Sequence, residues 1–445
     1  MKRLVLYTVL ALLMPCWAFA GDSLGLKEAI NLALEKNNLI KAALLEESAA
    51  RREAAASRGR YLPRVFLDET ATASNSPTRV FMMKLDEGRF TQEDFAIGNL
   101  NHPDTHGDFR TTLTLDQPIF DANIFTGAEI AGKEEQSRGF ALERRRQDVA
   151  YMVYSAALEV QKAREYLKAA EQGVKDATEH LRLSRVRGEA GVGLKSDELR
   201  ARTFLAEMEQ QNISAQNNLT MAGLRLAQLL GSAPGESADI KEELAPLPMK
   251  IPESELRRLA WENRQGLKEL SVAVEKGALS VKQASGEYLP KLYGTAAFQM
   301  NDRDIPFGRD NDSWMVGATL RWELFDGFIR CNEKGKAVAL QSAASEYLDN
   351  FKKEIALQVE ESRLRREEAS KRLEVARHSV EDSEEVVRLI SRRFENSIAT
   401  FVELLDAQTS LNRARAQLVG NESDYALSTA RLFHTTGTFL KEVMR

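Results

Sequence analysis

Apolar residues recur every seven positions along two long stretches that are otherwise polar. In the first stretch each large seam residue is followed, three positions later, by a small one. The large positions are Val160, Leu167, Val174 and Leu181, and the small ones are Ala163, Ala170, Ala177 and Ser184. The second stretch repeats the pattern with Leu373, Val380, Val387 and Phe394 against Ala376, Ser383 and Ile390. Such heptads predict helices that pack side by side, with small residues that let their backbones approach closely.

The predicted helices are too long for an ordinary globular domain. Two of them cover residues 122–187 and 327–395, and at about 1.5 Å per residue each reaches roughly 100 Å. The shorter predicted helices are about half as long and cover residues 26–60, 194–230, 253–286 and 400–436. Two short helices could therefore stack end to end beside each long one, which indicates an extended wall.

A different periodicity, with apolar and polar residues in strict alternation, marks four segments as strands. It is clearest from Trp314 to Phe325, and the other three segments are Val65–Ala73, Phe109–Ile119 and Leu292–Met300. A length of about ten residues suits a tilted strand of an outer-membrane barrel, although a half-buried sheet in a soluble protein has the same period. Because a membrane barrel needs about eight strands, several copies would have to share one.

The chain contains an internal duplication. The segment Gly59–Pro63 returns as Gly286–Pro290, and Phe120-Asp121 returns as Phe325-Asp326. We therefore expect a first repeat over residues 21–231, a connector over 232–252, a second repeat over 253–437 and a C-terminal tail over 438–445. The spacing between matching positions places a longer loop in the first repeat, at roughly residues 75–108.

The first twenty residues have the pattern of a signal peptide: Lys2 and Arg3, then an apolar run, then Ala18-Phe19-Ala20. An alternative is that Cys16 is a lipidated N-terminus. The chain has 61 basic and 66 acidic residues, so its mildly acidic charge of −5 offers no general affinity for nucleic acid. No later apolar run reaches the ~20 residues of a transmembrane helix.

Taken together, the duplicated strands and long helices resemble the TolC-like outer-membrane efflux proteins over nearly the whole chain. The marks are Tyr61-Leu62-Pro63 and Tyr288-Leu289-Pro290 before strands, Pro118–Asp121 and Leu324–Asp326 after strands, and two helix–helix turns. The resemblance implies a mainly α fold with a membrane β-barrel portion. It also implies a homotrimer in the outer membrane, with a twelve-stranded barrel on a long α-helical barrel that crosses the periplasm. The implied partners are outer-membrane lipid, a periplasmic adaptor and an inner-membrane pump of the RND or ABC type.

The resemblance also places a gate at the periplasmic mouth. Its acidic residues correspond here to Glu403 and Asp406, with Asp197 in the first turn. The turns that would contact the adaptor contain Gly191, Val192, Gly193 and Ser397. Two positions depart from the family pattern. The family's latch arginine is Ala399 here, for which Arg392 or Arg393 could substitute, and the second turn has Ser397 in place of glycine, so that Asn396 could adopt the left-handed conformation.

No pattern of catalytic residues or of a cofactor site is recognisable. His102, His106, Asp104 and Asp108 have a spacing that could hold a divalent metal, but we interpret them as loop surface and expect no metal. We therefore expect a passive exit duct of an efflux or type I secretion system and no enzyme. The alternative is an exported coiled-coil structural or adhesive protein. The cargo, whether a drug, a metal ion or a protein, is left open.

Overall fold

The computed structural model describes residues 24–240, 242–249 and 251–445. The expected signal peptide of residues 1–20, including Cys16, lies outside these residues. Within the described ranges, none of the helices combines the length and the apolar character needed to cross a membrane.

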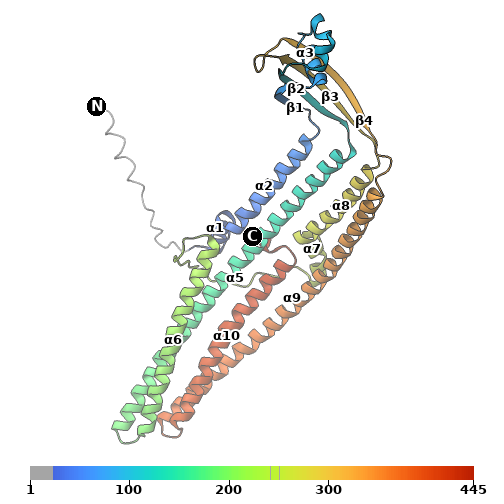
Figure 1. Cartoon of the computed structure of the whole chain (residues 1–445). Coiled ribbons are helices and arrows are strands. Elements are labelled where there is room, and N and C mark those ends of the chain that lie inside the picture. The colour runs from blue at the N-terminus through green and yellow to red at the C-terminus, as the bar shows by residue number, and fades with distance from the viewer. Residues whose placement is uncertain (1–23, 241, 250) are drawn as a thin grey trace, which may run out of the picture. The chain divides into compact units, whose positions relative to one another are not determined.

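The order of elements repeats once along the chain (Figure 1). The first half contains α1 (Leu26–Lys36), α2 (Asn38–Gly59), β1 (Arg64–Ser74), β2 (His106–Phe120), α5 (Ala122–Glu189) and α6 (Lys195–Leu230). The second contains α7 (Leu256–Asn263), α8 (Gln265–Gly286), β3 (Lys291–Asp302), β4 (Asn311–Arg321), α9 (Ile329–Glu395) and α10 (Phe401–Thr435). A short helix, α11 (Phe439–Val443), lies in the expected tail. The predicted fold class, mainly helical with duplicated strands and long helices, is confirmed.

The first short helix of each half is interrupted, where the sequence pattern had predicted one continuous helix. Between α1 and α2, Asn37 is extended, with ψ of 129°. Its side-chain amide donates to the carbonyl oxygen of Leu229 at 2.9 Å and accepts from the amide of Leu39 at 2.9 Å. Between α7 and α8, Arg264 is likewise extended, with ψ of 113°. An apolar pattern cannot reveal such a break, because the phase of the apolar face continues across it.

The predicted long loop of the first half is partly helical. It contains α3 (Pro77–Asp86), a 3-10 turn η1 (Gln92–Phe95) and α4 (Ile97–Asn101). Glu87 is only 1% exposed, and its carboxylate lies 2.8 Å from Nε2 of His106. Burial raises the pKa of Glu87. Arg89 forms ion pairs with Asp304 and Asp310 of the β3–β4 turn, which fixes this segment against the end of the sheet.

The chain divides into two compact units, each built from both repeats. One unit comprises residues 1–42, 144–264 and 354–445 and is helical in its described part. The other comprises residues 43–143 and 265–353 and contains all four strands.

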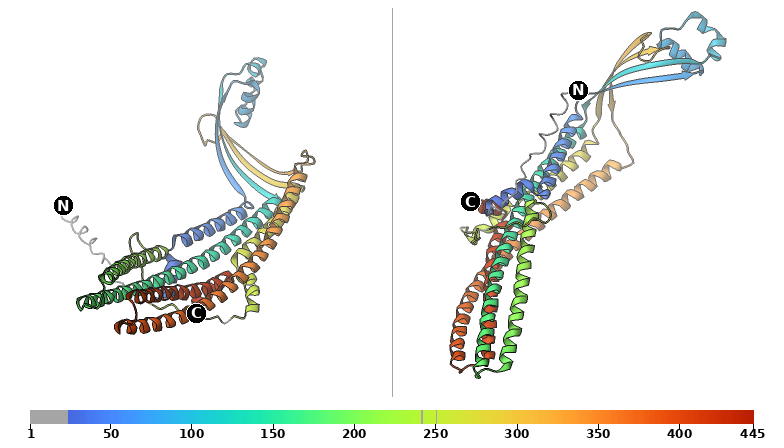
Figure 2. Two further views of the ribbon diagram at one scale, coloured as in Figure 1. Left: turned by 90° about the horizontal axis from the view of Figure 1, so that it is seen from below. Right: turned by 90° about the vertical axis from the view of Figure 1, so that its left-hand side faces the viewer.

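The strands form one antiparallel sheet in the order β1-β2-β3-β4 (Figure 2). Residues that face each other across the strands share a face, and Leu67, Leu113 and Phe298 lie on the apolar one. The predicted fourth strand extends too far, because β4 ends at Arg321. The indole of Trp322 instead donates to the carbonyl oxygen of Tyr288 at 3.1 Å, which takes the chain out of the sheet.

In the helical unit the C-terminal parts of α5 and α9 run beside α6 and α10 toward two turns at the same end (Figures 1 and 2). The predicted seam positions are buried or half-buried in both long helices here. Ala177 is completely buried and packs with Phe204 and Met208 of α6. In α9, Leu373 and Ala376 are buried as well. The heptads therefore identified the packing faces of both long helices correctly.

Candidate functional site

The first turn, between α5 and α6, depends on two glycines. Gly191 has a φ of +75°, a conformation that side-chain-bearing residues rarely adopt. The amide of Gly193 donates to the carbonyl oxygen of Arg187 at 2.9 Å. A Cβ atom at Gly193 would lie 2.8 Å from the backbone nitrogen of Gly188, so no larger residue fits without a shift of the turn.

The second turn, between α9 and α10, also contains a residue with positive φ, but that residue is not a glycine. Ser397 has a φ of +60° and takes the left-handed conformation itself. The prediction for Asn396 is therefore wrong, and its side-chain amide instead donates to the carbonyl oxygen of Arg392 at 2.8 Å. The free energy cost of this conformation at a non-glycine residue is about 1–2 kcal/mol, so contacts elsewhere must hold the turn.

A small apolar core joins the two turns. Its buried members come from both halves of the chain: Leu181, Ala201, Phe394, Ala399, Phe401 and Leu404. Ala399, which occupies the family's arginine position, is only 8% exposed in this core. An arginine there would bring a guanidinium into apolar surroundings, at a large desolvation cost. An arginine latch at position 399 is therefore incompatible with this packing.

Arg187, which the sequence analysis did not single out, connects the two turns instead. Its Nη1 donates to the carbonyl oxygen of Phe394 at 3.0 Å, and its Nη2 donates to Oγ of Ser397 at 2.9 Å. Its guanidinium carbon also lies 4.6 Å from the centre of the Phe394 ring. Within the described residues of the single chain neither Arg392 nor Arg393 forms an ion pair or side-chain hydrogen bond, and their role as substitutes for the latch stays a prediction. The only sequence signal for Arg187 is its position beside the heptad seam.

The three predicted gate acids lie near these turns but do not contact one another. Glu403 caps α10: its amide donates to Oγ1 of Thr400 at 3.3 Å, and its carboxylate accepts from that hydroxyl at 3.0 Å. Glu403 and Asp406 are exposed, and Asp197 is half-buried at the start of α6. Among the described residues, no ion pair or side-chain hydrogen bond links Asp197 or Asp406 to a basic residue.

Farther along the same helices a polar layer interrupts the apolar seam. Gln408 of α10 is 2% exposed, and its amide donates to the carboxylate of Asp176 of α5 at 3.1 Å. His180, one turn further along α5, lies near Gln408, and burial lowers the pKa of its imidazole. Arg415 lies 4.0 Å from Asp176 and 2.8 Å from Glu384 of α9. This layer joins the two halves, and the sequence analysis did not identify it.

Of the four histidines and aspartates singled out in the first long loop, His106 and Asp108 are engaged in the fold, whereas His102 and Asp104 are exposed. His106 is bonded to Glu87, and Asp108 accepts a hydrogen bond from the amide of Asn301 at 2.9 Å. Across residues 24–240, 242–249 and 251–445, no group of three or more histidine, cysteine, aspartate or glutamate side chains has a geometry that could hold a metal ion.

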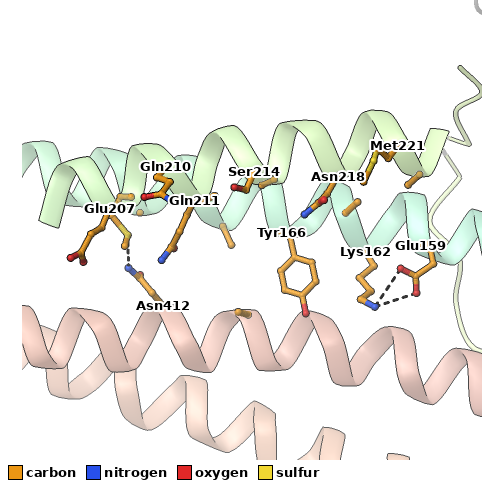
Figure 3. Close-up of a pocket in the computed structure, with 18 of the residues that line it drawn as sticks. Glu159, Lys162, Tyr166, Glu207, Gln210, Gln211, Ser214, Asn218, Met221 and Asn412 are labelled. Atoms are coloured by element: carbon orange, nitrogen blue, oxygen red, sulfur yellow. Dashed lines mark hydrogen bonds and ion pairs between the residues drawn. The ribbon is translucent and has the colours of Figure 1, made fainter. Parts of the chain in front are cut away.

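A cavity of about 720 Å³ lies between α5, α6 and α10 (Figure 3). The ring of Tyr166 points from α5 toward α10, and Asn412 approaches from the opposite side. The lining consists mainly of alanines and uncharged polar side chains, and its Lys162 is paired with Glu159 at 3.2 Å.

Comparison with known proteins gives consistent matches. Residues 29–232 and 256–438 match the family model described as "Outer membrane efflux protein". The alkaline protease secretion protein AprF of Pseudomonas aeruginosa is 24% identical, with 97% of this chain and 88% of that protein covered. The proteases secretion protein PrtF of Dickeya chrysanthemi is 23% identical, with 96% and 90% covered. The outer membrane channel CmeC of Campylobacter jejuni has a similar fold, with a TM-score of 0.78, 15% identity, and 93% and 86% covered.

Proposed function

Because this chain belongs to the outer membrane efflux protein family, we propose that three copies of it form the exit duct of a type I protein secretion system. The protein is an outer-membrane channel that extends into the periplasm. In this role it is a passive conduit, and the energy for transport comes from a pump in the inner membrane.

The open sheet carries the proposal of a trimer. Neither edge strand, β1 or β4, has a second partner in the sheet order, and unpaired strand edges are not tolerated in lipid. Four strands are too few to close a barrel, whereas three copies supply twelve. Exposed apolar side chains in the unit that contains the sheet also support contact with a neighbouring copy. Leu340 and Tyr347 of α9 are 61% and 69% exposed in the single chain.

Two relatives that align over nearly the whole chain are named for protease secretion. We therefore favour secretion of polypeptides over efflux of small molecules. The partners would then be a periplasmic adaptor and an inner-membrane pump of the ABC type. Efflux with a pump of the RND type is the competing function.

The turns provide the contact surface for the adaptor in this proposal. Val192 is 66% exposed, and Ile398, in the adjacent turn, is 68% exposed. Exposed apolar side chains at a helical tip are suited to be covered by a protein partner. Gly191, Gly193 and Ser397 would shape this surface, and Glu403, Asp406 and Asp197 would line the mouth of the assembled duct.

Two measurements test the proposal. Membrane fractionation, detergent extraction and native mass measurement should give an outer-membrane trimer, and a stable folded monomer would contradict it. In a strain that lacks the gene, a secreted polypeptide should accumulate inside the cells while sensitivity to small toxic compounds stays unchanged. The reverse result would assign the duct to small-molecule efflux.

A further inference from the structure

The two faces of the sheet differ sharply in chemistry. One face is apolar and includes Val65, Leu115, Val316 and Leu320. The opposite face is polar. In the strand register Arg64 lies opposite Asp116, Tyr293 opposite Thr319, and Lys291 opposite Arg321. In an outer-membrane barrel the apolar face contacts lipid and the polar face lines the water-filled lumen. The polar side chains near the helical end of the strands therefore face the transport path of the proposed duct.

Three arginines gather at that end of the polar face. Arg60, Arg64 and Arg321 line one cavity of about 510 Å³. The only carboxylate among its lining residues belongs to Asp116. The cavity therefore has an excess of positive charge, and arginine keeps its charge at any physiological pH.

The neighbouring acids do not neutralise all of this charge. Asp116 accepts a hydrogen bond from Oγ1 of Thr295 at 2.9 Å and forms no ion pair with Arg64. The nearby acid Glu287 is 3.0 Å from Lys291, while Asp121 accepts from the hydroxyl of Tyr293 at 2.7 Å.

Of the three arginines, only Arg60 has an acidic partner, Glu53 at 3.6 Å. In the described part of the chain, Arg64 and Arg321 form neither an ion pair nor a side-chain hydrogen bond. Each presents its guanidinium donors to the solvent of the cavity.

Both free arginines lie on the edges that must join in a closed barrel. Arg64 is the first residue of β1, and Arg321 is the last residue of β4. Since β1 runs away from the helical end and β4 runs toward it, β4 of one copy can pair antiparallel with β1 of the next. This pairing brings the two arginines to the same end of each seam between copies.

We propose that Arg64 and Arg321 form a basic belt at the three seams of the duct, which binds anionic groups in transit. The ligand class is a carboxylate or phosphate, because the planar guanidinium matches both in geometry. The belt rests on the proposed trimeric channel and adds to it a preference for anions and acidic stretches of polypeptide.

The test is the ion selectivity of the purified full-length protein in planar lipid bilayers. The reversal potential in a potassium chloride gradient gives the ratio of chloride to potassium permeability. The double variant Arg64→Gln with Arg321→Gln should lower this ratio by a factor of roughly two to five, and inorganic phosphate should reduce its chloride conductance less than in the parent. The variant with lysine at both positions should keep the parent's permeability ratio.

Arg309→Gln is the matched control, because this exposed arginine of the same unit is already paired with Asp312 at 2.9 Å. It should leave the selectivity unchanged. Each single glutamine variant should give part of the shift, which keeps the test available if the double variant does not assemble. Parental selectivity in an assembled glutamine variant would overturn the belt alone. A parent protein that forms no channel would instead overturn the proposed function.

Discussion

Arg187 and Ser397 are 210 positions apart in the chain, yet Nη2 of the arginine donates to Oγ of the serine at 2.9 Å. The same guanidinium donates to the carbonyl oxygen of Phe394 at 3.0 Å, near the end of α9. Arg187 of α5, the helix that leads into the first turn, thus donates to two acceptors at the second turn. A positive charge at the C-terminal end of a helix also interacts favourably with the helix dipole. The two turns are therefore coupled within a single protomer.

We expect Arg187→Met to loosen this coupling. The substitution removes two hydrogen bonds from a charged donor that is only half-buried, so the expected loss is about 1–2 kcal/mol of local stability. Hydrogen–deuterium exchange should become faster for the amides of residues 394–400. Arg182→Met is the control, because Arg182 is paired only with Glu179 of its own helix, at 2.6 Å. Equal protection of residues 394–400 in the parent and the Arg187 variant would contradict the coupling.

The proposed gate predicts an effect on channel block. Glu403→Gln with Asp406→Asn removes two negative charges per chain, six in a trimer, and glutamine can still accept the capping hydrogen bond from Thr400. Block of single channels by multivalent cations applied from the periplasmic side should weaken by about tenfold or more. Glu381→Gln with Asp382→Asn, at exposed positions of α9, should have no such effect. If both double variants were blocked like the parent, the two acids would be only a solvated start of a helix.

The polar layer predicts a dependence on pH. Burial lowers the pKa of His180 below its ordinary 6.5, so near this pH the unfolded state binds more protons at this residue than the folded state does. Stability should therefore fall as the pH decreases through about 6.5. The groups that face His180 are Asp176 and Glu179 of α5 and Gln408 of α10; the two carboxylates raise its pKa and oppose this effect.

The measurement for this prediction is the thermal midpoint at pH 7.5 and pH 5.5. The difference between the two should be smaller in His180→Asn than in the parent. His378→Asn is the control, since the side chain of His378 is 71% exposed. A pH dependence that His180→Asn leaves intact would show that other groups cause it.

Packing of the seam predicts different results for leucine substitutions at two alanines of the same heptad position. Ala177→Leu should destabilise the protein, whereas Ala170→Leu should cost little. Ala177 is completely buried against Phe204 and Met208, so Ala177→Leu should overpack the seam and cost about 1–3 kcal/mol of the free energy of unfolding. Ala170 lines the cavity of Figure 3, where a larger side chain has room within the protomer. Denaturant unfolding of the detergent-solubilised protein compares the two variants. Equal losses would indicate that the cavity at Ala170 is filled in the assembled protein.

The sequence by itself determined the duplication, the long helices and their seams, and the strands with their two faces. The helices and strands show a local period of seven or two residues, which follows directly from backbone geometry, and the duplication shows as short motifs that return later in the chain. The position of the first turn was also predictable, because Gly191 and Gly193 follow the end of the heptads, whereas the second turn, which has no glycine, was placed by the family resemblance. The gate acids were proposed from the family resemblance, and their role is still a prediction.

Only the tertiary structure decided which side chains meet across the two halves. The contact of Arg187 with Ser397, the burial of Ala399 and the bond between Gln408 and Asp176 all depend on the axial alignment of one helix pair against the other. A heptad specifies which face of a helix is buried and leaves its shift along the neighbouring helix undetermined, because a shift of seven residues preserves the apolar pattern. The breaks at Asn37 and Arg264 escaped prediction for a related reason, since a periodic pattern records no change of direction. Packing of the apolar cores and pairing of the polar groups select a single alignment.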